Sequence, residues 1–277
     1  MKHQDLKWQS SDGIDIYGQC WLSDAKPKAV VCLVHGMGEH SGRYAHVAKY
    51  LVDSGYSVIA YDQRGHGKSG GKRGHTPSYD LLLDGVTDLL NQAEKIAPGV
   101  PKFIYGHSMG GNVVLNYALR RKPEVAGIIA SSPYLKLAFD PPAIKVALGK
   151  LVNNIFPGFT QGTELDATAI SRDKKVVDAY LSDPLVHDKI SARFFVEVHG
   201  AGLWAIEHAS EMKLPLLLFH GTEDKLTSPE GSKEFAEKVK ENCTFRLWDG
   251  FYHETHNEPE KEEVLKYIST WLDSRLG

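Results

Sequence analysis

Short apolar runs recur along the chain, and segments with helical periodicity separate them. Most of these runs are rich in Val, Ile and Leu and do not alternate with polar residues. That pattern is typical of strands buried on both faces of a parallel sheet. The segments predicted as strands are residues 29–34, 57–61, 102–105, 126–130, 214–219 and 244–248.

The segments between these runs have the spacing of amphipathic helices. In the last of them Val264, Ile268 and Trp271 repeat at i, i+4 and i+7, so one face of that helix is expected to be buried. The alternation of strands and helices predicts an α/β fold with a mainly parallel sheet. For residues 11–22 we expect an additional antiparallel strand or hairpin. The predicted helices are residues 43–54, 79–96, 110–122, 229–241 and 259–276.

The alternation stops between residues 132 and 209. This segment lies between two predicted strands and contains closely spaced apolar residues at positions 144–159. Those apolar residues have two interpretations: they form the core of a cap that packs on the main domain, or they line a channel for an apolar ligand. We predict one discontinuous main domain, residues 1–131 and 210–277, with residues 132–209 inserted into it as a helical cap.

Composition narrows the class of protein. The 277 residues are 42% hydrophobic and 24% charged, which is ordinary for a globular protein. The formal net charge is −3 and no basic block occurs, so we expect no binding to nucleic acid. No apolar stretch approaches the roughly 20 residues that a membrane-spanning helix needs. The first residues lack the apolar region of a secretory signal, so we expect a soluble cytoplasmic protein.

The chain gives no signal for a metal or a cofactor. Its three cysteines, Cys20, Cys32 and Cys243, fit neither a zinc ribbon nor a redox CxxC pair, and they favour a reducing compartment. The segment His253-Glu254-Thr255-His256 resembles the zinc motif HExxH, but the motif requires histidine at position 257, which is Asn. We therefore expect no metal.

One short motif carries the clearest chemistry. Gly106-His107-Ser108-Met109-Gly110 follows a predicted strand and opens a predicted helix. This is the G-x-S-x-G pattern in the strand–turn–helix context of a nucleophile elbow. The glycines leave room for a sharp turn with strained backbone angles, and the helix N-terminus directs free N–H groups at developing negative charge. We predict that Ser108 is a nucleophile.

A serine hydroxyl attacks efficiently only when a base removes its proton, so a histidine and an acid are expected elsewhere. In this architecture the order along the chain is Ser, acid, His, each on a loop after a later strand. Asp224 follows the predicted strand at 214–219, and His253 follows the one at 244–248. We predict that Ser108, Asp224 and His253 form a catalytic triad.

Two neighbours of these residues are alternatives, and a third has a different interpretation. Glu223 is adjacent to Asp224 and could replace it as the acid. His256 lies three residues after His253 and could replace it as the base. His107 precedes the serine, but adjacent residues at a tight turn point apart, so we interpret it as a packing or hydrogen-bonding residue.

Acyl transfer also needs hydrogen-bond donors for a tetrahedral oxyanion. One is the backbone N–H of the residue after the nucleophile, here Met109. The second comes from the loop after the first strand of the parallel sheet, here His35-Gly36-Met37-Gly38. In that loop we predict the backbone N–H of Met37.

These segments together resemble the monoacylglycerol lipases and lysophospholipase-like relatives of the serine α/β hydrolases, over nearly the whole chain. The resemblance implies the α/β-hydrolase fold with an eight-stranded core, a mobile cap over the site, hydrolysis of single-chain acyl esters and no cofactor. It is weakest over residues 139–161. The matching segments are His35–Tyr44, Asp62–Ser69, Gly106–Gly111, Ser171–Asp173, Tyr180–Leu185, Gly221–Lys225 and Tyr252–Glu254.

The expected activity is hydrolysis of a monoacylglycerol to fatty acid and glycerol through an acyl-enzyme on Ser108. A lysophospholipid, a short-chain ester or a thioester is the alternative substrate, because specificity depends on the pocket and not on the elbow. A third interpretation, an inactive hydrolase fold that binds a ligand, is disfavoured by the intact triad. Leu148, Leu151 and Ile155 are candidates for substrate binding, and the cap is a candidate for transient contact with a membrane or micelle.

Overall fold

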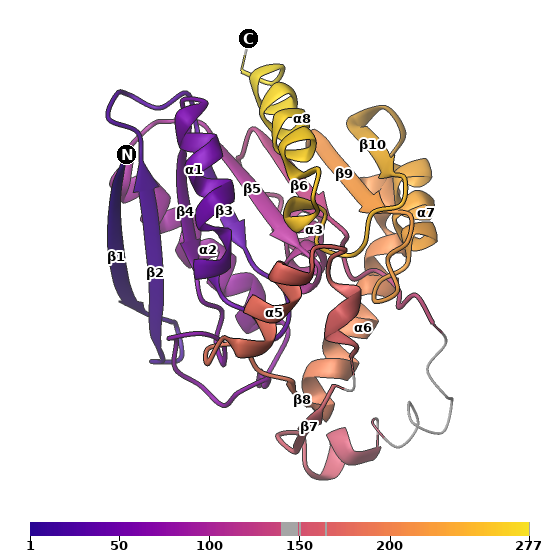
Figure 1. The fold of residues 1–277 in the computed structure, drawn as a ribbon. Coiled ribbons are helices and arrows are strands. Elements are labelled where there is room, and N and C mark those ends of the chain that lie inside the picture. The colour runs from indigo at the N-terminus through magenta and orange to yellow at the C-terminus, as the bar shows by residue number, and fades with distance from the viewer. Residues whose placement is uncertain (140–148, 150, 164, 277) are drawn as a thin grey trace.

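The computed structural model describes residues 1–139, 149, 151–163 and 165–276. A central sheet has the strand order β1-β2-β4-β3-β5-β6-β9-β10 (Figure 1). The pairs β1–β2 and β2–β4 are antiparallel, and all other pairs in this sheet are parallel, as the apolar runs predicted. The strands are β1 Lys2–Gln9, β2 Asp15–Leu22, β3 Val30–Val34, β4 Ser57–Tyr61, β5 Lys102–His107, β6 Gly127–Ser131, β9 Leu216–Gly221 and β10 Cys243–Trp248.

Helices cover both faces of the sheet (Figure 1). Along β3, Val31 and Leu33 point to the face covered by α1 and α8, whereas Val30, Cys32 and Val34 point to the face covered by α2, α3, α6 and α7. Burying such a side chain fully contributes about 1.5–3 kcal/mol, so a strand between two layers gains on both faces and needs no polar positions. The helices are α1 Ala45–Asp53, α2 Asp80–Ile96, α3 Met109–Arg121, α5 Lys174–Ser182, α6 Ala192–Glu207, α7 Pro229–Val239 and α8 Lys261–Asp273.

The N-terminal hairpin is longer than the sequence predicted. The expected strand within residues 11–22 is β2, and β1 pairs with it from Lys2 to Gln9. Alternate residues of β1, namely Gln4, Leu6 and Trp8, are half-buried, while the residues between them are exposed. An edge strand of this kind carries a weak apolar signal, because only one of its faces meets the core.

The segment between β6 and β9 contains two differently packed parts. The helix α6 packs into the main core, with Phe194 and Val198 fully buried. Two amide side chains of α3 reach it: Asn112 donates to the carbonyl of Val198 at 3.0 Å, and Asn116 to that of Ala201 at 3.1 Å. The helix α5 belongs instead to a small separate cluster, and the strands β7 Thr160–Gly162 and β8 Lys189–Ser191 pair with each other. The division of the chain into a cap at 132–209 and a main domain stays a prediction.

Within the described ranges, no helix is both long enough and apolar enough to cross a membrane.

Candidate active site

Ser108 lies at a strained turn between β5 and α3. Its backbone angles are φ 54° and ψ −117°, a conformation that residues with a side chain rarely adopt. The end of β6 and the loop after it hold the serine there: the Ser108 N–H donates to the carbonyl of Ser131 at 2.9 Å, and its carbonyl accepts from the N–H of Tyr134 at 2.9 Å. A Cβ atom at Gly106 would overlap the carbonyl of Gly110, so the small residues that flank the serine are sterically required.

The two predicted oxyanion donors flank this turn. Met109 is the first residue of α3, so its N–H has no partner within the helix and sits at the positive end of the helix dipole. The loop after β3 lies against the serine, because a Cβ placed on Gly36 would be 3.2 Å from the Cβ of Ser108. The next residue, Met37, is half-buried. Neither N–H donates a hydrogen bond within the described part of the chain, which suits both for the predicted role.

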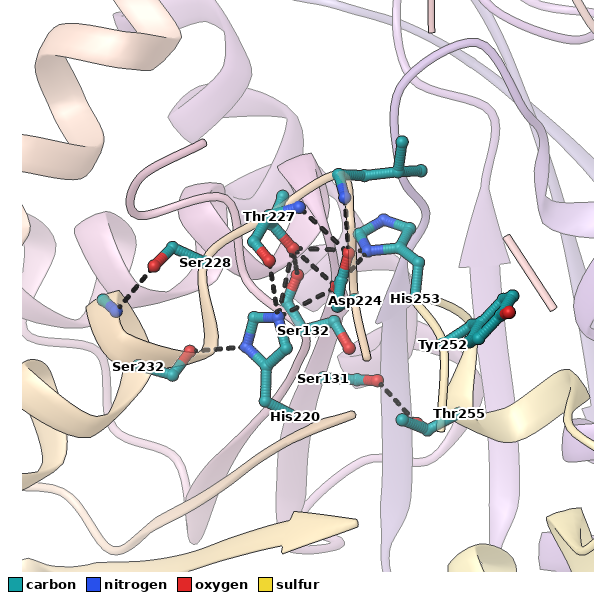
Figure 2. Close-up of polar contacts among 12 residues, drawn as sticks. Ser131, Ser132, His220, Asp224, Thr227, Ser228, Ser232, Tyr252, His253 and Thr255 are labelled. Carbon is teal, nitrogen blue, oxygen red and sulfur yellow. Dashed lines mark hydrogen bonds and ion pairs between the residues drawn. The ribbon is translucent and has the colours of Figure 1, made fainter. Parts of the chain in front are cut away.

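Asp224 lies on the loop after β9 and is buried (Figure 2). Its Oδ1 accepts hydrogen bonds from the backbone N–H groups of Leu226 and Thr227, at 2.8 and 3.0 Å. Its Oδ2 accepts from Nδ1 of His253 at 2.6 Å. Burial raises the pKa of Asp224, but the charge of His253 and hydrogen bonds from two histidines hold it well below its usual value. The alternative acid, Glu223, has an exposed side chain.

His253 follows β10 and is 5% exposed. Because its Nδ1 donates to Asp224, the tautomer with a lone pair on Nε2 is favoured, which is the form that a general base needs. Burial by itself lowers the pKa of His253, but the charge of Asp224 and its hydrogen bond raise it above the usual value. The structure thus brings the predicted acid and base together.

Ser108 and His253 are not hydrogen-bonded to each other, although the residue beside the serine contacts the predicted base. Ser108 is half-buried, and its neighbour His107 has its ring 4.7 Å from the ring of His253. Among the described residues, the Ser108 hydroxyl forms no hydrogen bond with His253. Such bonds are often long in free enzymes and tighten when substrate binds. The assignment of Ser108, Asp224 and His253 as a triad stays a prediction.

His107 and His256, which also lie near the site, do not have the surroundings that a general base needs. Burial and the positive charge of His253 lower the pKa of His107 to about 3, so His107 is neutral. His256 stacks on Tyr44 with ring centroids 4.9 Å apart, and burial holds its pKa well below the usual value. Neither ring nitrogen of His256 has a hydrogen-bond partner among the described residues, so no acid orients it.

A buried ionic network that the sequence did not reveal surrounds the site. Arg43 donates to Glu39 at 2.5 Å and to both oxygens of Glu254 at 2.7 Å. Glu39 also accepts from the Gly36 N–H and from the Tyr44 hydroxyl, each at 2.6 Å. The signal for this network was charged residues within the segments 35–44 and 252–254, but charge alone does not pair residues so far apart in the chain.

The segment around α5 covers the loop after β3. The N–H of His187 donates to the carbonyl of Gly38 at 2.8 Å. The ring of Tyr180 lies 4.7 Å from the guanidinium carbon of Arg43. Gly38 has φ +74°, and a Cβ there would overlap the carbonyl of His187, so only glycine allows this close approach. Contacts with the segment around α5 therefore hold the predicted oxyanion loop in place, as Glu39 does.

Metal binding has no support in the part of the chain that the structure describes. No group of three or more His, Cys, Asp or Glu side chains there could hold a metal ion. Glu254, the acid in the segment that resembles a zinc motif, is paired with Arg43 instead.

Comparisons with known proteins agree with this geometry. A family model described as Serine aminopeptidase, S33 matches residues 25–260. The chain is 36% identical over 266 residues to a monoacylglycerol lipase of Mycolicibacterium smegmatis, covering 95% of each chain. The crystal structure of the Paleococcus ferrophilus monoacylglycerol lipase superimposes with a TM-score of 0.84 at 36% identity, over 99% of this chain and 100% of that one. These matches confirm the predicted α/β-hydrolase fold.

Two further relatives differ from these monoacylglycerol lipases in name or in length. The chain is 33% identical over 263 residues to the phospholipase YtpA of Bacillus subtilis, covering 92% of this chain and 99% of that one. It is also 40% identical over 270 residues to an abhydrolase domain-containing protein of Dictyostelium discoideum, of whose length it spans 28%. Similar cores thus occur in proteins with more than one named substrate and more than one length.

Proposed function

The chain belongs to the Serine aminopeptidase, S33 family and resembles its monoacylglycerol lipases over its whole length, and we propose that it hydrolyses monoacylglycerols to a fatty acid and glycerol. The observation that carries this proposal is the 2.6 Å hydrogen bond between His253 and Asp224, at the same edge of the sheet as the strained turn at Ser108. The carboxyl ends of β5, β9 and β10 meet at this edge, where α/β sheets place their sites.

The proposed reaction uses side chains and backbone groups alone. His253, oriented by Asp224, takes the proton of the Ser108 hydroxyl, and the oxygen attacks the ester carbonyl. The N–H groups of Met37 and Met109 stabilise the oxyanion. The protonated His253 then gives its proton to the departing glycerol oxygen. Water, deprotonated by the same histidine, hydrolyses the acyl-enzyme and restores the hydroxyl of Ser108.

The charges beside the site favour an uncharged substrate. An aminopeptidase binds the positive α-ammonium group of a peptide, which requires a negative partner in the site. The carboxylates of Glu39 and Glu254 are both paired with Arg43. Asp224 is occupied by its histidine and by backbone N–H groups. An ester of neutral glycerol therefore fits the described surroundings better than a peptide with a free N-terminus.

Substrate profiling tests this proposal. We expect kcat/KM for a 1-monoacylglycerol to exceed that for lysophosphatidylcholine, for a short-chain p-nitrophenyl ester and for an amino-acid p-nitroanilide. The lysophospholipid is the most informative competitor, because one relative is a phospholipase. A kcat/KM for lysophosphatidylcholine well above that for monoacylglycerol, measured below the critical micelle concentration of each, would contradict the substrate assignment.

We further propose that part of the inserted segment contacts a membrane or a micelle. Leu151, Ile155 and Phe156 are 55%, 58% and 68% exposed, and Phe159 beyond them is 59% exposed. Apolar side chains gathered on a surface favour transfer into a lipid interface. Leu148, also a candidate for substrate binding, lies outside the described residues. Leu151 and Ile155 stay predictions as substrate-binding residues, since their side chains face solvent here.

Liposome flotation tests the membrane contact. A Leu151→Ser/Phe156→Ser variant should bind vesicles less than the wild-type protein does. The control is Leu247→Ser on β10, which removes an exposed leucine outside the inserted segment and should leave binding unchanged. Equal partitioning of wild-type protein and double variant would refute the contact.

A further inference from the structure

A second histidine reaches the carboxylate of Asp224 (Figure 2). His220 is the penultimate residue of β9, and its side chain is completely buried. Its Nε2 lies 2.9 Å from Oδ2 of Asp224, the same oxygen that accepts from His253 at 2.6 Å. Two imidazoles, one from β9 and one from the loop after β10, therefore share one carboxylate oxygen, and the proposed mechanism uses only one of them.

Asp224 determines which nitrogen of His220 carries the proton, and Ser232 holds the other nitrogen. Ser232 lies in the first turn of α7, and its hydroxyl is 2.8 Å from Nδ1 of His220. An ionised carboxylate accepts only, so Nε2 of His220 must be the donor to Asp224. With the proton on Nε2, a neutral ring has a lone pair on Nδ1, and the Ser232 hydroxyl donates to it. Ser232, His220 and Asp224 thus form a chain of directed hydrogen bonds.

In this arrangement two imidazole donors, from His220 and His253, stabilise the negative charge of Asp224. A carboxylate that accepts an additional N–H bond has part of its negative charge stabilised by that donor, and it attracts a neighbouring proton less strongly. The hydroxyl of Thr227 also lies 2.9 Å from Oδ2, but a single hydroxyl proton must serve Asp224 and the carbonyl of Ser132, 3.1 Å away. His220 is the donor whose direction is fixed by another side chain.

We propose that His220 is a positioning residue that shares the negative charge of Asp224 and so keeps His253 available as an unprotonated base at neutral pH. This inference rests on the proposed roles of Asp224 and His253. Without the N–H of His220, Asp224 would hold the proton on His253 more tightly, and a larger fraction of the enzyme would be inactive at neutral and acidic pH.

The other described groups around His253 do not replace the effect that His220 has on the charge of Asp224. Arg43 pairs with both glutamates, and His107 is neutral, so Asp224 is the partner that sets the charge on the base. Around His220 the described polar partners are Asp224, Thr227 and Ser232. Among the described residues, the titratable groups that face His253 are Asp224 from the loop after β9, Glu39 from the loop after β3, His107 from β5, and Glu254 and His256 from its own loop.

Two substitutions of His220 separate hydrogen bonding from packing. His220→Leu fills the space but removes the donor, whereas His220→Gln places an amide N–H near the position of Nε2. In His220→Leu we expect the acid-side midpoint of the kcat/KM profile to rise by about one pH unit, which is about a tenfold loss below the midpoint, with activity recovering at high pH. In His220→Gln both the midpoint and the rate should return to within about threefold of wild type.

A pair of serine variants on one helix provides the matched control. Ser232→Ala removes the hydroxyl that fixes the ring of His220, and its midpoint should shift in the same direction by a smaller amount. Ser228→Ala removes the N-cap of α7, whose hydroxyl accepts from the Gly231 N–H at 3.2 Å, without touching His220. It should lower the thermal midpoint and leave the pH profile unchanged.

The outcomes distinguish this inference from the proposed function. Wild-type protein that neither turns over esters nor reacts with a fluorophosphonate at Ser108 would refute the function. Active wild-type protein with an unchanged midpoint in folded His220→Leu would refute the role of His220. If His220→Leu does not fold, an unchanged midpoint in Ser232→Ala refutes it instead.

Discussion

The guanidinium of Arg43 donates two hydrogen bonds of 2.7 Å to the carboxylate of Glu254, which lies 211 residues further along the chain. The same guanidinium pairs with Glu39, and Glu39 accepts from the N–H of Gly36 in the predicted oxyanion loop. Glu254 directly follows His253. One buried cation thus joins the loop that is proposed to stabilise the oxyanion to the loop that carries the proposed base.

Replacing Arg43 should therefore destabilise the fold strongly. Arg43→Met leaves two buried carboxylates without their cation, and breaking a buried pair in this way costs about 3–5 kcal/mol in the free energy of unfolding. Urea denaturation at pH 7 measures the loss. The control is Arg121→Met, which breaks exposed pairs at 3.2 Å with Asp80 and Asp84 and should change stability by less than about 0.5 kcal/mol. Equal losses in both variants would contradict the buried network.

The network of Arg43, Glu39 and Glu254 also predicts how the free energy of unfolding depends on pH. Although burial raises the pKa of Glu39, Arg43 and two neighbouring histidines lower it to about 2. A carboxylate with a depressed folded-state pKa contributes stability above its unfolded pKa, near 4.3, and loses that contribution as the pH falls toward 2. Glu39→Gln should therefore flatten the decline in unfolding free energy between pH 5 and pH 3, measured by urea titration. The exposed variant Glu241→Gln should keep the wild-type slope, and a Glu39→Gln curve parallel to wild type would exclude Glu39 as a source of the decline.

The pH profile of catalysis follows from His253. A general base must be unprotonated, and the pKa of His253 lies above its usual value because Asp224 outweighs the effect of burial. We expect kcat/KM to rise with pH through a single ionisation with its midpoint above the ordinary histidine value of about 6.5. A pH–rate series on a soluble p-nitrophenyl ester measures this. A midpoint below that value, or no acid-side loss, would be incompatible with the Asp224–His253 pair as drawn.

Two helical glycines should respond oppositely to alanine. A Cβ at Gly110 in α3 would overlap the carbonyl of Val34, so Gly110→Ala must displace the turn at Ser108. We expect a loss of about 3 kcal/mol in unfolding free energy together with most of the activity. Gly200 in α6 is exposed with open space around it, and Gly200→Ala should gain about 0.5–1 kcal/mol with activity unchanged. Similar stability changes in the two variants would show that space at the elbow is not limiting.

The parts of this site that follow strand order could be predicted from the sequence. Apolar runs located the strands, and each candidate of the triad follows one of those runs directly. The prediction of Ser108, Asp224 and His253 needed only the strand order and the glycine spacing around the serine. Strand order left Glu223 open as an alternative to Asp224, and its side chain is exposed in the structure.

Contacts between distant segments could not be predicted in this way. Arg43 and Glu254 carry no mark of their pairing, because a charged residue in a loop is usually solvated. The sequence places His220 directly after a predicted strand, and its bond to Asp224 depends on how the loop after β9 folds back. β1 was missed because an edge strand with one half-buried face has little apolar contrast. In each case the missing information is the position of a second segment.

Covalent labelling of Ser108 tests the central claim most directly. Wild-type protein treated with a fluorophosphonate should lose its monoacylglycerol hydrolysis in proportion to modification, and mass spectrometry should place the adduct on the peptide that contains Ser108. Ser108→Ala should take up no probe and should lose nearly all turnover while its unfolding curve stays close to wild type. Full monoacylglycerol hydrolysis by folded Ser108→Ala, or an adduct on another serine that abolishes activity, would contradict the account.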